Sequence, residues 1–109
     1  MAVVDAVIAD RAVEAVRVIG RWGRVRAAYL FGSQAQGTAD QWSDIDVAAF
    51  LEGIEDWDLQ RRATAMALVM EEAGSNVEAH LLPVSALQKP EPGSFAEHIL
   101  KHGVRIYGE

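Results

Sequence analysis

The chain of 109 residues contains no cysteine, so disulfide bonds and thiolate metal sites are excluded. A protein without disulfides is suited to a reducing compartment, and we expect this one to be cytoplasmic. The sequence has no uninterrupted apolar run that approaches the ~20 residues of a membrane-spanning helix. Asp5 and Asp10 interrupt the apolar N-terminal stretch, which argues against a signal peptide.

Positive charge is also scarce. Ten Lys and Arg residues stand against sixteen Asp and Glu residues, which gives a formal net charge of −6. Nucleic-acid binding is therefore disfavoured, because it needs clustered basic residues. A solvated helix face or a patch for an acidic partner or nucleotide would explain the basic residues that gather in the first quarter of the chain. These residues are Arg11, Arg17, Arg21, Arg24 and Arg26.

The length fits one domain, which we assign to residues 1–109. Apolar residues at helical and alternating spacing predict a series of elements along it. In chain order these are helix 3–20, strand 25–31, strand 44–51, helix 59–74, strand 77–82, helix 94–103 and strand 104–107. A helix joins the second and third strands, so they are expected to be parallel. The fold class predicted is α+β, a mixed sheet flanked by helices, with Met66 and Met70 filling the core.

The most informative segment is GSQAQGTADQWSDID, residues 32–46. Asp44 and Asp46 begin the second strand, where alternate residues share a face, so their carboxylates project side by side. Two such carboxylates repel each other unless a cation lies between them. Mg²⁺ answers this need, since it prefers oxygen ligands and commonly joins carboxylates to substrate phosphates. Two ions about 4 Å apart would stabilise both oxygens of an in-line phosphoryl displacement.

Gly32 and Ser33 follow the first strand directly. A glycine there allows the backbone to approach a ligand closely, and a serine at a helix start offers donors to a phosphate. A simple turn with an N-cap is the alternative. Glu78, in the otherwise apolar third strand, is the candidate third carboxylate; a rim glutamate that faces water is the alternative.

Several other residues are weaker candidates. His80 shares a strand face with Glu78 and could line the site, although a partly buried, hydrogen-bonded histidine is the simpler interpretation. His98 and His102 have a zinc-type spacing, but the pattern offers no third ligand. Trp42 is expected to pack over the loop or to stack on a base.

The segments GSQAQG, SDIDVAAF and NVEAHLLP resemble the minimal nucleotidyltransferases of the DNA polymerase β-like superfamily. The likeness extends over nearly the whole chain, because the ending FAEHILKHGVRIYGE is also similar. It implies the polymerase β-like fold, with Gly32 and Ser33 on the nucleotide's β and γ phosphates. Asp44 and Asp46 would then bind Mg²⁺, and Glu78 would match the third acidic position, often an aspartate. Gln36 stands where many members carry an arginine.

The resemblance implies an enzyme that transfers a nucleoside monophosphate, AMP from ATP, to an acceptor hydroxyl and releases pyrophosphate. Small members of this type are often antitoxins that adenylylate a partner toxin of the helical HEPN type. The alternative is a catalytically weak binding module that neutralises such a toxin by forming a complex. A chain of 109 residues has no room for an acceptor-recognition domain, so a partner or a second copy would complete the cleft. The acceptor, the base preference and the oligomeric state stay open at this stage.

Overall fold

A four-stranded sheet forms the centre of the computed structural model, which describes residues 5–39 and 43–108. Its strands lie in the spatial order β3-β2-β1-β4. The strands are β1 (Val25–Phe31), β2 (Ile45–Leu51), β3 (Val77–Pro83) and β4 (Val104–Gly108). β1 is antiparallel to both of its neighbours, whereas β2 and β3 are parallel. The predicted parallel pair and the predicted mixed sheet are therefore confirmed.

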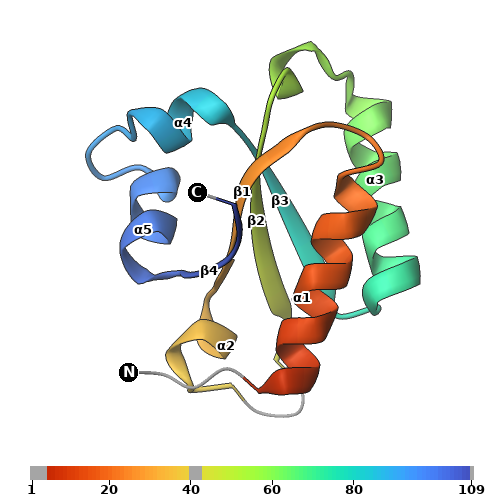
Figure 1. Ribbon diagram of the computed structural model, residues 1–109, viewed down its shortest axis with the longest axis vertical. Coiled ribbons are helices and arrows are strands. Elements are labelled where there is room, and N and C mark those ends of the chain that lie inside the picture. Colours follow the sequence, from red (N-terminus) through yellow and green to blue (C-terminus); the bar gives the residue numbers. More distant parts are fainter. Residues whose placement is uncertain (1–4, 40–42, 109) are drawn as a thin grey trace.

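Helices cover both faces of the sheet, α1 and α3 on one side and α4 and α5 on the other (Figure 1). The long helices are α1 (Ala6–Ile19), α3 (Leu59–Ala73) and α5 (Phe95–His102), and the short ones are α2 (Ser33–Gln36), η1 (Ile54–Asp56) and α4 (Val84–Gln88). α4 was not predicted, because five residues are too few to show a helical period and Pro83 looked like a stop.

Alternation along β2 divides the core into two layers. Ile45 and Val47 pack with α1 and α3, while Ala48 and Phe50 pack with α5. Six of the seven residues of β2 are buried, and Asp46 is the partly exposed exception. A run of this kind is typical of a central strand that is covered on both faces. Asp46 shares the face of Ala48 and Phe50, so it projects on the α5 side of the sheet.

Side-chain caps fix where the helices begin. Asp58 accepts a hydrogen bond from Arg61 N at 2.7 Å, and Ser94 Oγ accepts one from Glu97 N at 3.2 Å. Caps of this kind contribute about 1 kcal/mol each. Ser94 and Glu97 form a modified capping box, since the Glu97 side chain accepts a hydrogen bond from Gly93 N at 3.1 Å. This cap sets the start of α5 and so places Phe95 beside the sheet.

The prediction that Met66 and Met70 fill the core is wrong. Their exposed fractions are 37% and 47%, and the buried residues of α3 are Ala65, Val69 and Ala73. Trp42 lies outside the described residues. None of the described helices has the length and apolar character needed to cross a membrane.

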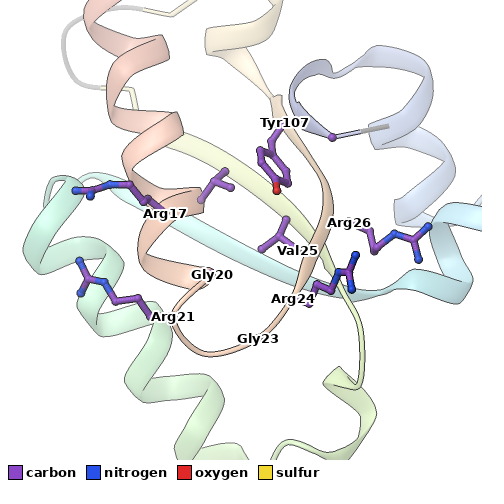
Figure 2. A pocket seen from close by; sticks show the side chains of 10 residues that line it. Arg17, Gly20, Arg21, Gly23, Arg24, Val25, Arg26 and Tyr107 are labelled. Atoms are coloured by element: carbon purple, nitrogen blue, oxygen red, sulfur yellow. The ribbon is translucent and has the colours of Figure 1, made fainter.

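Four of the five arginines of the first quarter contact acidic groups of the protein itself, and Arg11 donates a hydrogen bond to Asn76 Oδ1 at 3.4 Å. Several surround a hollow of about 590 Å³ between the end of α1 and the start of β1, and Figure 2 shows their side chains. The ion pairs are Arg17–Glu14, Arg21–Glu72, Arg26–Glu52 and Arg24–Glu52, with N–O distances of 2.7, 2.7, 3.0 and 3.8 Å. These contacts favour a solvated, ion-paired surface over an open anion patch.

The pair Arg21–Glu72 joins the turn after α1 to α3 through two hydrogen bonds, of 2.7 and 2.8 Å. The hydrogen bonds from Arg21 lower the pKa of Glu72 below its ordinary value of 4.5. A lowered folded-state pKa means that the stabilisation is present above the ordinary value and is lost as the pH falls through the folded value. We therefore predict that Glu72→Gln lowers the melting temperature at pH 7, and that the difference from wild type closes on acidification below pH 4.5. Thermal melts across this range test it, with Glu71→Gln as an exposed control on the same helix. A difference that persists at the lowest pH would contradict the ion-pair origin.

Candidate active site

Gly32 connects β1 to α2 in a backbone conformation that only glycine adopts easily. Its φ is +76° and its ψ is −155°. A Cβ at this position would lie 2.9 Å from Oδ2 of Asp46. The missing side chain therefore lets the turn after β1 lie directly against the Asp46 carboxylate. The glycine at this turn therefore reverses the chain and also leaves room for the Asp46 carboxylate.

Asp46 lies at the second position of β2, between its two neighbouring strands. Its backbone is paired with Phe31 of β1 and with Glu78 of β3. The Asp46 side chain is 24% exposed, so it is partly desolvated and still reachable from solvent. The like charges of Asp46 and Glu78 repel each other, and a cation between them would relieve this repulsion. The pairing therefore creates a place that favours a bound cation.

Glu78 and His80 project from the same face of β3 toward Asp46. One ligand atom from each of the three side chains lies within 4.8 Å of the other two. His80 Nε2 is 3.3 Å from Asp46 Oδ1 and 3.8 Å from Glu78 Oε1. The structure therefore places Glu78, the candidate third carboxylate, beside Asp46 of the adjacent strand.

Asp44 is exposed and immediately precedes β2. It lines a hollow of about 270 Å³ that Glu78 also lines, together with Met66 and Met70 of α3. The segment that carries Asp44 is held at the start of the strand by a hydrogen bond of 2.8 Å from Ile45 N to Asn76 O. Asp44 and Glu78 thus share a rim, although the structure places Asp44 just outside β2 rather than within it.

Ser33 begins α2, a helix of a single turn. Gly32 O accepts hydrogen bonds from Ala35 N at 3.1 Å and from Gln36 N at 3.2 Å, which closes the turn. Gly37 ends it with a φ of +74°. The predicted nucleotide-binding pair, Gly32 and Ser33, therefore lies on the side of Asp46 where Gly32 makes its close approach. The side chain of Gln36 is exposed at the end of this turn.

His80 belongs to the cluster more closely than the sequence suggested. It is partly buried and contacts Asp46, as a hydrogen-bonded histidine would, but its partner is a site carboxylate. Its ring also packs edge-on against Phe31 and Phe95, with centroid distances of 5.0 and 5.7 Å. The signal in the sequence was the spacing of two between Glu78 and His80, which places both side chains on one strand face.

The family of the chain follows from comparison with known proteins. Residues 16–109 match the family described as polymerase beta, nucleotidyltransferase. The chain therefore belongs to this nucleotidyltransferase family, and the predicted polymerase β-like fold is confirmed. The comparison with curated proteins gives no match.

The chain also matches solved structures. One is a chain in a crystal structure of a toxin–antitoxin with AMP-PNP, with a TM-score of 0.63 and 19% sequence identity. The match covers 93% of this chain and 73% of that one. Another is a proposed nucleotidyltransferase from Sulfolobus solfataricus, with a TM-score of 0.47 and 17% identity over 78% of this chain and 81% of that one.

The donor set suits the divalent metal that nucleotidyltransferases generally use. Asp46 and Glu78 present carboxylate oxygens beside one another, and Asp44 lies on the same rim as Glu78. Hard divalent cations prefer such oxygen ligands, and a cation would relieve the repulsion between the acids. The residues therefore fit the group that the family implies.

The contact between Gly32 and Asp46 gives a test with a matched control. We predict that Gly32→Ala destabilises the fold by about 2 kcal/mol, because it combines a strained φ with a Cβ pressed on a carboxylate. It should also weaken metal binding by displacing Asp46. Gly53 has a similar φ of +72° but open space around its Cβ position. Gly53→Ala should therefore cost about 1 kcal/mol and leave metal binding intact. Denaturant unfolding and metal titration measure both effects, and equal behaviour of the two variants would contradict the close approach.

Proposed function

We propose that this protein transfers a nucleoside monophosphate, AMP from ATP, to a hydroxyl group on a partner protein and releases pyrophosphate. The observation that carries the proposal is the meeting of Gly32, Asp46 and Glu78 from three separate segments of a polymerase beta family domain. A glycine turn beside paired carboxylates is a suitable arrangement for a triphosphate and its cations.

Each residue has a distinct part in this reaction. The backbone at Gly32 and the hydroxyl of Ser33 bind the β and γ phosphates. Asp44, Asp46 and Glu78 hold divalent metal, and two Mg²⁺ ions are expected from the resemblance. Bound Mg²⁺ would neutralise the phosphates and lower the pKa of the acceptor hydroxyl. Glu78, the most exposed of the clustered groups at 54%, is placed to accept the proton of that hydroxyl. The acceptor oxygen bonds to the α phosphorus as the bond to the bridging oxygen breaks and pyrophosphate leaves.

A protein acceptor is supported by the surface beside the carboxylates. The exposed side of α3 carries an apolar stripe made of Leu59, Ala63, Met66, Ala67 and Met70. Leu59 is 82% exposed, and Met66 and Met70 reach the hollow that contains Asp44 and Glu78. Contiguous exposed apolar surface commonly marks a protein interaction site. A partner that covers this stripe would have its own side chains near the site, and a helical HEPN-type toxin is the partner that the resemblance implies.

The second candidate is an antitoxin that binds the same partner without efficient transfer. Gln36 favours it, because a neutral amide at the end of α2 supplies no positive charge to the triphosphate. The similar fold in a toxin–antitoxin structure with AMP-PNP supports both candidates equally.

One experiment separates the two candidates. The protein is incubated with labelled ATP, Mg²⁺ and the product of the adjacent gene as the candidate partner, and that partner is analysed by mass spectrometry. Transfer adds the mass of AMP to a hydroxyl side chain of the partner. A stable complex with no added mass would support the binding module, and neither complex nor transfer would contradict both candidates.

We predict that Asp44→Asn, Asp46→Asn and Glu78→Gln each reduce transfer about a hundredfold or more, because each removes a charged metal ligand. Asp44→Asn should leave the folded state as stable as wild type or more stable, since it removes like charge from the rim of the hollow.

Ser33→Ala should weaken nucleotide binding by about 1 kcal/mol or more through loss of a hydrogen bond to a charged group. Circular dichroism checks that each variant is folded, and full transfer by a folded variant would refute the role assigned to that residue.

We predict that Met66→Glu and Met70→Glu weaken binding of the partner by about tenfold or more, because each places a charge in a buried apolar contact. Both side chains are exposed in the free protein, so the stability of the fold should change little. Val13 on α1 is 50% exposed and lies away from the site, so Val13→Glu is the matched control. Calorimetric titration of the partner into each variant measures the change in affinity. Equal losses for all three would mean that the stripe has no special role.

A further inference from the structure

Asp46 offers its two carboxylate oxygens to two different surroundings. Oδ2 faces the turn at Gly32, 2.9 Å from the position a Cβ would occupy there. Oδ1 faces β3, where His80 Nε2 is its neighbour at 3.3 Å. The first side presents a glycine turn and its serine. The second side presents one more carboxylate, from Glu78, and an imidazole.

We propose that His80 is a metal ligand together with Asp46 and Glu78. Its imidazole makes the site formed by these three side chains prefer Mn²⁺ and other transition-metal ions over Mg²⁺. The inference deepens the proposed function, because it concerns the metal of the same site. It does not depend on whether transfer occurs, since it rests on the ligand atoms alone.

The distances support a shared ion. An octahedral ion about 2.1 Å from each ligand places adjacent ligand atoms about 3 Å apart and opposite ones about 4 Å apart. His80 Nε2 lies 3.3 Å from Asp46 Oδ1 and 3.8 Å from Glu78 Oε1, so small side-chain movements would be enough. The three side chains come from neighbouring positions of two paired strands, which is a rigid support for a ligand set.

The chemistry of the donors determines the preference. Carboxylates alone suit Mg²⁺, whereas a neutral imidazole adds affinity mainly for transition-metal ions. Phe31 and Phe95 pack against the ring of His80, which restricts its rotation. A fixed ring with one nitrogen directed at two carboxylates is better arranged for coordination than a free surface histidine.

Simple hydrogen bonding is the competing explanation. In that case His80 would donate to Asp46 and orient it, and any metal would be held by the carboxylates alone. His80→Gln separates the explanations, because an amide keeps a donor for Asp46 but is a poor ligand for transition metals. His80→Asp adds an oxygen ligand in place of nitrogen and should move the preference toward Mg²⁺.

The measurements start from a background that removes the other histidines. His98 and His102 are exposed, four residues apart, and have ring centroids 5.0 Å apart, so they could bind metal themselves. The double variant His98→Gln/His102→Gln leaves His80 as the only histidine of the three in the chain. Mn²⁺ and Mg²⁺ affinities are measured calorimetrically without nucleotide. Nitrogen NMR then follows the His80 ring during titration with Zn²⁺, a diamagnetic reporter of coordination.

In this background we expect Zn²⁺ to shift the Nε2 resonance of His80 far more than the Nδ1 resonance. We expect His80→Gln to lower Mn²⁺ affinity about tenfold or more and Mg²⁺ affinity less than about threefold. An unshifted Nε2 resonance, equal losses for both ions, or no detectable Mn²⁺ binding at millimolar concentration would overturn the proposal. The NMR result needs no substitution at His80, so it decides even where a variant fails to fold. None of these measurements depends on nucleotide transfer. Failure of this proposal can therefore be distinguished from failure of the proposed transferase function.

Discussion

The in-register parallel pairing of β2 with β3 is the constraint on which the site depends. It sets Asp46 directly opposite Glu78, and the period of two places His80 on the same face. A slip of one residue would turn Glu78 and His80 toward α1 and α3, where the core would have to accept a charge. The buried residues of the two strands, Ile45 and Val47 against Val77 and Ala79, specify the register. The packing that stabilises the sheet therefore also positions the carboxylates.

The site in turn acts against the stability of the sheet. Asp46 brings a partly desolvated charge into a strand that is otherwise buried, and Glu78 adds like charge beside it. His80 offsets part of this cost, because its ring nitrogen lies 3.3 Å from Asp46 and stands between the two acids. Gly32 adds a second cost, since glycine loses the most backbone freedom on folding. Both costs lie where a ligand would bind, which is the usual place for local conflict in a functional protein.

Much of this arrangement could be predicted from the sequence, and the limits have physical causes. Strand, glycine turn and Asp-x-Asp are local signals, and the helix between the second and third strands implied the parallel pair that brings Glu78 close. The register is not local, so the contact between His80 and Asp46 could not be derived. Met66 and Met70 were misassigned because α3 carries apolar residues on its exposed side as well as its buried side. Periodicity alone could not distinguish the face that packs on the sheet from the face left open.

The open face of α3 connects the architecture to the proposed partner. This helix is the crossover between β2 and β3, so it must start near the end of one strand and finish near the start of the next. Its last turns therefore lie at the end of the sheet where Asp44, Asp46 and Glu78 gather, and Met70 reaches their rim. The helix α3 links the two strands that hold Asp46 and Glu78, and its apolar stripe ends at the hollow that Asp44 and Glu78 line. A partner bound along α3 would then be guided toward the carboxylates by the topology of the fold itself.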